Sequence, residues 1–290
     1  MTQEHRLLKI AASPAIAVEV AGQGQLVVFL HGIGGNRKNW LYQLDAVAAE
    51  FTAAAWDARG YGDSEDYEGG LRFGDFSNDL VRVVDHFGVQ RVHLVGISMG
   101  GRIALDFYSQ WPDRVASLTL ADTSAGNSRT NSAEAIDAFL AIRKRPLLEG
   151  KTPRDIAPAI LATLVGPGTD ELAREQMRES LAQLRPGSYL KTLDTVTRYS
   201  AFPPFESIAV PTLVLVGEHD RIAPPEHARD MASRIPQSQF AVIAGASHIS
   251  NMDRPGDFNR LLLEFLRANH ARGVNVAEPW AKSHAGGPRK

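Results

Sequence analysis

A serine in this sequence stands where a strand-like run meets a helix-like stretch. Ser98 lies in Gly96-Ile97-Ser98-Met99-Gly100, after VHLV and before an amphipathic segment. Glycines two positions before and after the serine permit a tight strand-to-helix turn, in which larger side chains would collide with the neighbouring chain. Such a turn directs the hydroxyl toward the carboxyl ends of the strands, where open α/β sheets bind ligands. We therefore predict Ser98 as a nucleophile; the alternative is a glycine-rich connection with an incidental serine.

A serine nucleophile needs a base within hydrogen-bond reach, and histidine suits this task near neutral pH. His248 follows the strand-like run QFAVIAG in the short loop GASH, which delivers it to the same edge of the sheet. The other candidates lie in expected tails, at the end of the last helix, or within a helix and a strand with no polar neighbourhood. They are His5, His284, His270, His86 and His93. We predict His248 as the base.

The acid that orients the histidine should also follow a strand. Asp220 ends the loop GEHD after the run TLVLV, and Glu218 and His219 are expected to pack against or cap that turn. Asp122, which ends the run SLTLA, is the alternative acid in a layout shifted by one strand. The chain order serine, aspartate, histidine matches the motif rule for such a turn, so Asp220 is our prediction.

Two backbone amides are expected to stabilise an oxyanion. Met99 begins the helix after the serine, where an unpaired N–H and the helix dipole favour negative charge. The loop His31-Gly32-Ile33-Gly34-Gly35-Asn36 follows the run LVVFL, and we predict the Ile33 N–H as the second donor. A phosphate-binding loop is the rival interpretation, but the Lys-Ser or Lys-Thr ending and the G-x-G-x-x-G pattern are missing. His31 is expected to brace the loop.

These residues require a sheet whose strands end at one edge. Apolar runs rich in β-branched residues alternate with amphipathic stretches, which predicts a mostly parallel sheet covered by helices on both faces. The first two strands are too close together for a crossover helix, so they should pair antiparallel at an edge. The eight predicted strands are Leu7–Ile10, Ala15–Val20, Leu26–Leu30, Thr52–Trp56, Val92–Val95, Ser117–Ala121, Thr212–Val216 and Gln239–Ile243. The predicted helices of the core are Trp40–Ala49, Phe76–Phe87, Met99–Gln110 and Asp257–Asn269.

The organisation along the chain is a core interrupted by an insertion. Residues 123–206 are rich in Ala, Leu, Arg and Glu and lack strand-like runs, so they are predicted to form a helical cap between core segments 1–122 and 207–272. Acidic and basic residues alternate in the cap, so any one arginine there is expected on a solvated face. The segment 273–290 is expected to be a disordered tail. Four aromatic residues are weighed as borders of a pocket, although packing is their commoner fate. They are Trp40, Phe139, Phe202 and Phe205.

Composition excludes several classes of function. The 290 residues include 31 basic and 33 acidic side chains, and this near balance offers no excess charge for nucleic acid or an anionic membrane. Cysteine is absent, which excludes disulfides, thiolate metal sites and a cysteine nucleophile. No apolar run reaches the roughly 18 residues of a membrane span. We expect a soluble cytoplasmic protein, or a secreted one if a leader has been removed; its oligomeric state stays open.

Taken together, HGIGG, WDARGYGDS, GISMGG, GEHD and GASH resemble the α/β-hydrolase superfamily across residues 26–266. The short cap and the GISMGG turn are most similar to esterase and lactonase members such as the 3-oxoadipate enol-lactonases. The resemblance implies a pocket between cap and core, with Ser98, Asp220 and His248 as a catalytic triad and with Ile33 and Met99 as amide donors. It also implies an ester or lactone substrate, an acyl-enzyme intermediate, and no metal or organic cofactor.

Some relatives fit less well. Haloalkane dehalogenases and epoxide hydrolases carry an aspartate where Ser98 stands, and carbon–carbon bond hydrolases of ring-cleavage products usually carry an asparagine where Ile97 stands. These carbon–carbon bond hydrolases are the second choice, and a perhydrolase or haloperoxidase-like activity is another alternative. A ligand-binding receptor on the same fold is the non-enzyme alternative. In WDARGYGDS, Asp57 and Arg59 are expected to brace the loop as a pair.

Overall fold

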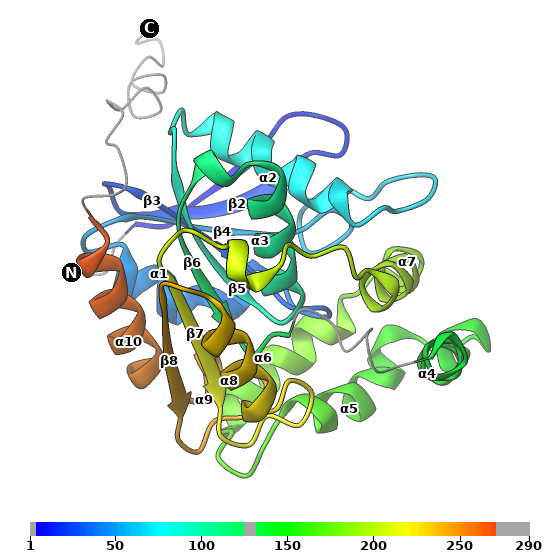
Figure 1. The fold of residues 1–290 in the computed structure, drawn as a ribbon. Coiled ribbons are helices and arrows are strands. Elements are labelled where there is room, and N and C mark those ends of the chain that lie inside the picture. The colour runs from blue at the N-terminus through cyan, green and yellow to red at the C-terminus, as the bar shows by residue number, and fades with distance from the viewer. Residues whose placement is uncertain (1–3, 125–131, 271–290) are drawn as a thin grey trace, which may run out of the picture.

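The computed structural model describes residues 4–124 and 132–270 (Figure 1). The tail predicted at 273–290 lies outside the described residues, and so does part of the predicted cap, residues 125–131. None of the helices within the two described ranges is both long enough and apolar enough to cross a membrane.

Within these ranges the strands form one eight-stranded sheet in the order β1-β2-β4-β3-β5-β6-β7-β8. β2 pairs antiparallel with β1 and β4, whereas all pairings from β4 through β3 to β8 are parallel. The predicted mostly parallel sheet with an antiparallel edge pair is therefore confirmed. The strands are β1 (Arg6–Ile10), β2 (Ile16–Ala21), β3 (Leu26–Leu30), β4 (Thr52–Trp56), β5 (Val92–Ile97), β6 (Val115–Ala121), β7 (Thr212–Gly217) and β8 (Ser238–Ile243).

Helices cover both faces of the sheet. Those of the core are α1 (Leu41–Val47), α2 (Gly74–His86), α3 (Met99–Gln110), α8 (Pro225–Arg234), α9 (Ser250–Asp253) and α10 (Pro255–Ala268). Buried residues of α2, α3 and α8 belong to one hydrophobic cluster, and those of α1 and α10 belong to another. Short 3-10 turns are η1 (Arg37–Trp40), η2 (Pro112–Arg114) and η4 (Phe205–Ser207).

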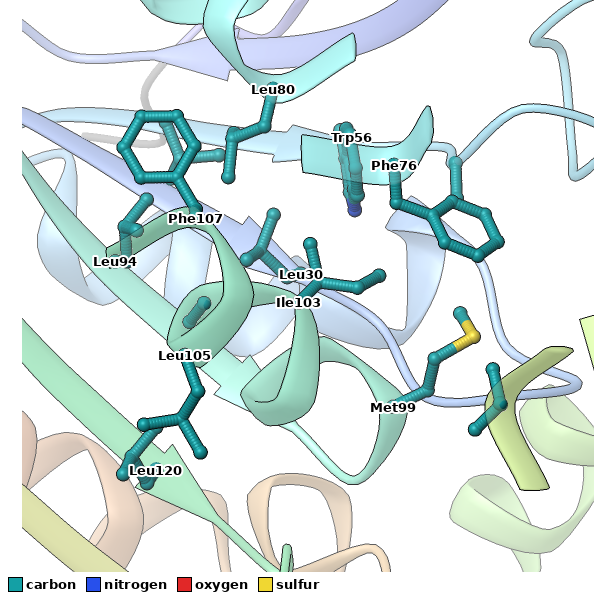
Figure 2. Packing of buried hydrophobic residues seen from close by; sticks show 14 of the residues in the cluster. Leu30, Trp56, Phe76, Leu80, Leu94, Met99, Ile103, Leu105, Phe107 and Leu120 are labelled. Atoms are coloured by element: carbon teal, nitrogen blue, oxygen red, sulfur yellow. The ribbon is translucent and has the colours of Figure 1, made fainter. Parts of the chain in front are cut away.

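The two clusters lie on opposite faces because successive strand residues point to opposite sides. In β3, Val28 and Leu30 contribute to the cluster under α3, whereas Val27 and Phe29 contribute to the cluster under α1 and α10. Figure 2 shows the first cluster, in which strand side chains pack with those of α2 and α3. Strands covered on both faces need apolar residues at consecutive positions, which is why the LVVFL and TLVLV patterns predicted the sheet.

Between β6 and β7 the described residues, 122–124 and 132–211, form helices and no strand. They are α4 (Ala133–Leu148), α5 (Pro153–Leu164), α6 (Glu171–Ala182) and α7 (Pro186–Arg198). In Figure 1 these helices lie together at one side of the sheet, with α4 outermost. The Asn36 side chain donates to Ser180 Oγ of α6, and the Arg185 guanidinium donates to the carbonyl oxygens of Gly62 and Ser64. Hydrogen bonds thus connect α6, and the residue between α6 and α7, to the loops after β3 and β4.

We predict that Phe107→Ala lowers the free energy of unfolding by about 3–5 kcal/mol, because it leaves a cavity in a tightly packed core. Phe107 of α3 is fully buried near Leu80 and Leu94 (Figure 2). Urea denaturation measures the loss. Ile142→Ala is the control: its side chain is 73% exposed, so the change should stay within about 0.5 kcal/mol. Similar losses in both variants would contradict this description of the core.

Candidate active site

Ser98 occupies a strained turn between β5 and α3. Its φ of 53° and ψ of −116° lie outside the regions that side chains usually adopt. The Ser98 N–H donates to the carbonyl oxygen of Ala121 at 2.9 Å, and the Thr123 hydroxyl donates to the Ser98 carbonyl oxygen at 2.7 Å. These bonds from β6 and the residues after it hold the turn in place, with the Ser98 side chain partly accessible.

The glycines around Ser98 are required by close packing of the backbone. A Cβ at Gly96 would lie 2.3 Å from the carbonyl carbon of Gly100, and a Cβ at Gly100 would lie 1.9 Å from the carbonyl oxygen of Leu30. Both distances are far below van der Waals contact. The steric argument made from the sequence therefore applies to both positions, and α3 can start against β3 only because Gly100 has no side chain.

His248 reaches Ser98 from the loop that follows β8. Its Nε2 lies 2.9 Å from Ser98 Oγ, and the residue is 5% exposed. The two residues are 150 positions apart in the chain. The parallel order β5-β6-β7-β8 brings the loops after β5 and β8 to the same edge of the sheet, as the sequence predicted.

Asp220 contacts the other side of the His248 ring. The Nδ1–H of His248 donates to Asp220, with Oδ2 at 2.8 Å and Oδ1 at 3.0 Å. Asp220 Oδ1 also accepts from the backbone N–H groups of Ile222 and Ala223, at 2.8 and 3.0 Å. This arrangement fixes the tautomer with hydrogen on Nδ1, which leaves Nε2 free to accept the Ser98 hydroxyl hydrogen.

Two opposing effects act on the pKa of His248. Burial favours the neutral ring and lowers the pKa, but the hydrogen bond and negative charge of Asp220, with a further contribution from Asp122, outweigh burial. The pKa of His248 is therefore raised above 6.5. A raised pKa makes the ring a stronger acceptor for the hydroxyl proton.

Asp122, the alternative acid, bonds backbone groups and not the ring. Its Oδ1 accepts from the Gly217 N–H at 2.8 Å and its Oδ2 accepts from the Ser250 N–H at 3.0 Å. Burial, followed by the negative charge of Asp220, raises the pKa of Asp122 to about 7. Asp122 thus links the loop that carries Asp220 to the chain after His248, and the structure places Asp220 in the position expected of the acid.

The predicted amide donors flank Ser98. Met99 is the first residue of α3, so its N–H lacks an intrahelical partner. On the other side, a Cβ built on Gly32 would lie 3.3 Å from Ser98 Cβ, which shows how closely the loop after β3 approaches the serine. Within the described parts of the chain, the neighbouring Ile33 N–H has no hydrogen-bond acceptor. Both amides are therefore available to a ligand oxygen near Ser98.

His31 braces this loop, as expected. Its Nδ1–H donates to the Gly32 carbonyl oxygen at 2.8 Å, and its Nε2 accepts from the Ala58 N–H at 3.0 Å. Burial lowers the pKa of His31 against the opposing effects of the Gly32 hydrogen bond and the Asp57 charge. A neutral ring suits this pattern, because one nitrogen must donate while the other accepts.

The predicted Asp57–Arg59 pair is wrong. Asp57 pairs with the guanidinium of Arg37 and accepts from the Arg37 N–H, whereas Arg59 forms a bidentate pair with Asp79 at 2.6 and 2.7 Å. Each residue braces its loop through a partner far away in sequence. The short spacing within WDARGYGDS made the two residues look like partners, but each pairs with an opposite charge outside this segment.

The expectation that His93 has no polar neighbourhood is also wrong. Its Nδ1 lies 2.8 Å from Ser117 Oγ and its Nε2 lies 3.2 Å from Gln25 Oε1. Burial, together with the charge of His270, lowers the pKa of His93 to about 4. The residue is a buried structural histidine in the sheet, whose polar partners come from β6 and from the residue before β3.

Ser98 and His248 open onto a cavity lined by the loop after β3, by the chain after His248 and by α4, α5, α6 and α7. The lining residues are His31, Gly32, Ile33, Gly35, Asn39, Ile97, Ser98, Phe139, Arg143, Ile160, Thr163, Leu164, Met177, Tyr189, Leu193, Ile222, His248, Ile249, Asn251 and Met252. Of the four aromatic residues weighed from the sequence, only Phe139 is among them. Trp40 and Phe205 are buried in the core, and Phe202 packs against Phe73 and Tyr199.

Arg143, Tyr189 and Thr163 line the cavity without having been predicted from the sequence. Which face of each helix borders the cavity depends on how the helices pack, so periodicity alone did not show it. Among the residues that the structure describes, no cluster of three or more His, Asp or Glu side chains is arranged to hold a metal ion.

Comparison with known proteins assigns the family. A family model described as the alpha/beta hydrolase fold matches residues 25–255. The chain belongs to the α/β-hydrolase fold family. The resemblance seen in the sequence is thus confirmed, and with it the fold.

Individual relatives of this α/β hydrolase differ in activity. It is 26% identical over 251 residues to 3-oxoadipate enol-lactonase 2 from Acinetobacter baylyi, covering 84% of this chain and 91% of that protein. A solved structure of a thermophilic esterase from Thermogutta terrifontis is 30% identical, with a TM-score of 0.80, covering 92% of this chain and 99% of that one.

One longer relative is matched by this chain over only part of that relative's length. The dihydrolipoyllysine-residue acetyltransferase component of the acetoin cleaving system from Cupriavidus necator is 29% identical over 261 residues, covering 84% of this chain. The α/β hydrolase spans 64% of that protein, less than two thirds of its length.

We predict that Gly100→Ala destabilises the fold by about 3 kcal/mol or more, because a methyl group would overlap the Leu30 carbonyl oxygen and force α3 away from β3. Thermal and urea unfolding measure the loss. Gly187→Ala in α7 is the matched control, since nothing lies within 4 Å of its added Cβ. Equal stability of the two variants would contradict the close approach at this turn.

Proposed function

We propose that this α/β hydrolase cleaves carboxylic esters or lactones through an acyl-enzyme intermediate on Ser98. The observation that carries the proposal is the continuous chain of hydrogen bonds from Asp220 through His248 to Ser98 Oγ. This is the arrangement by which a base activates a serine hydroxyl while an acid orients the base.

In the proposed reaction, His248 Nε2 accepts the proton of Ser98 as Oγ attacks the carbonyl carbon. The oxyanion that forms is stabilised by the N–H groups of Ile33 and Met99. His248 then gives its proton to the leaving alkoxide, which departs as an alcohol or stays attached as the opened end of a lactone. Water that loses its proton to His248 attacks the acyl-enzyme, and Ser98 regains its proton when the acid is released.

The ester or lactone substrate is supported by the relatives and by the cavity. One relative at 30% identity is an esterase and another at 26% is an enol-lactonase. The cavity wall consists mainly of apolar side chains, which suits the carbon chain of such a substrate better than a highly charged group such as a phosphate.

Ser98→Ala should reduce kcat on a p-nitrophenyl ester by roughly 10⁴-fold or more, because the members of a triad act as a unit. It should also abolish covalent labelling by a fluorophosphonate. Ser109→Ala, at the far end of α3, is the matched control and should retain both properties. Near wild-type turnover or labelling of Ser98→Ala would refute Ser98 as the nucleophile.

The pH profile should reflect the raised pKa of His248. Since the base must be neutral, kcat/KM should rise with pH to a plateau, with a midpoint above 6.5. Asp220→Asn removes the charge that stabilises the protonated ring, so burial should dominate and the midpoint should move to lower pH. We also expect kcat/KM to fall by roughly 10³- to 10⁴-fold in this variant.

Initial rates between pH 5 and 9 measure both profiles. The control is Glu218→Gln, which removes a carboxylate from the same loop without changing contact with the ring. A flat wild-type profile, or a midpoint that Asp220→Asn leaves in place, would contradict the proposed pairing of Asp220 with His248.

A further inference from the structure

The cavity contains a cation that the proposed reaction does not use. Arg143 of α4 lines the cavity with Tyr189 of α7. Most other side chains from the helices around it are apolar, namely Phe139, Ile160, Leu164, Met177 and Leu193. A half-buried guanidinium beside apolar side chains interacts more strongly with an opposite charge than one in bulk water, because the effective dielectric is lower.

Arg143 differs from the basic residues beside it in α4. Lys144 pairs with Asp194, and Arg145 pairs with Glu149. Across residues 4–124 and 132–270, no carboxylate forms an ion pair or hydrogen bond with Arg143. Its guanidinium lies over the Phe139 ring, 5.5 Å from the centroid. This contact orients the side chain at the cavity wall and leaves its N–H donors available. Arg143 is half-buried, so this arginine is only partly solvated.

Tyr189 adds a neutral donor to the cavity that Arg143 also lines. The residue is 4% exposed, and its hydroxyl has no hydrogen-bond partner in the described part of the chain. Burial raises the pKa of Tyr189, and the positive charge of Arg143 acts in the opposite direction. The Tyr189 hydroxyl oxygen is not among the buried unpartnered polar atoms of the described residues, so it is accessible at the cavity wall and can donate to a ligand there.

We infer that Arg143, assisted by Tyr189, binds a carboxylate of the substrate. The inference rests on the proposed function and narrows it to esters and lactones that carry a second, free carboxylate, such as the half-esters of dicarboxylic acids. The planar guanidinium matches the two oxygens of a carboxylate, and the tyrosine hydroxyl donates one further hydrogen bond. The scissile carbonyl lies at Ser98 on the core, while the free carboxylate lies against α4 and α7.

Matched esters test this preference. The p-nitrophenyl half-ester of glutarate and p-nitrophenyl pentanoate have acyl chains of equal length and differ in the terminal carboxylate. Arg143→Gln should lower kcat/KM for the half-ester by roughly 10- to 100-fold and change kcat/KM for the pentanoate by no more than about twofold. Arg143→Lys keeps the positive charge but lacks the planar guanidinium. Its kcat/KM for the half-ester should therefore lie between those of the wild type and Arg143→Gln. Tyr189→Phe should lower kcat/KM for the half-ester by a smaller factor and leave kcat/KM for the pentanoate unchanged.

Arg145→Gln is the matched control, because it removes the same charge from the same helix but the Arg145 side chain is 75% exposed and lies outside the cavity lining. Arg145→Gln should leave kcat/KM unchanged for both esters. Thermal unfolding of every variant identifies any that fails to fold. If Arg143→Gln lowered kcat/KM equally for the two esters, or left the ratio of their kcat/KM values unchanged, the inference would be overturned.

A binding measurement separates this inference from the proposed reaction. Ser98→Ala, which cannot form the acyl-enzyme, is titrated calorimetrically with monomethyl glutarate, and so is Ser98→Ala combined with Arg143→Gln. Arg143→Gln should raise Kd by roughly 10- to 100-fold. Failure of the wild type to turn over any ester, with this difference in Kd intact, would reject the reaction but retain the carboxylate site. Equal affinities, or no binding of monomethyl glutarate to Ser98→Ala, would overturn the carboxylate site.

Discussion

The hydrogen bond between Ser98 and His248 depends on the strained turn at Ser98, and that turn depends on the absence of side chains around it. Gly100 lets the start of α3 approach the carbonyl oxygen of Leu30, and Gly96 lets the end of β5 approach Gly100. With α3 so close to β3, the hydroxyl stands between the loop after β3 and the start of the helix. The positive φ of Ser98 is tolerated because bonds from Ala121 and Thr123 hold the backbone on both sides.

Around this turn the protein concentrates buried charge. Asp220 has a fully buried side chain, and its two oxygens are satisfied by His248 and by two backbone N–H groups. Asp122 lies near enough to influence both residues, yet its own bonds go to the Gly217 and Ser250 N–H groups. A buried carboxylate is costly unless such bonds compensate for lost water. The same bonds therefore stabilise the loops and fix the position of the ring.

The helices between β6 and β7 contribute the other half of the cavity. They supply an apolar wall together with Arg143 and Tyr189, while the core supplies Ser98, His248 and the two amides. This division separates chemistry from recognition. Loops at the ends of the strands hold the reacting groups, and the inserted helices provide the side chains of the opposite cavity wall. The activities of relatives as different as an esterase and an enol-lactonase are consistent with such a division.

The sequence alone determined the sheet, its antiparallel edge and the residues at the candidate site, because each of these leaves a local pattern. Consecutive apolar residues indicate a strand covered on both faces, and glycines at fixed spacing around Ser98 indicate a turn that no other residue can form. Tertiary structure alone decided which polar and charged groups meet. Asp57 pairs with Arg37 and not with Arg59, His93 finds Ser117 and Gln25, and Arg143 faces the cavity while Lys144 finds Asp194. Ion pairs and cavity walls join elements that are far apart in the chain, so local periodicity cannot predict them.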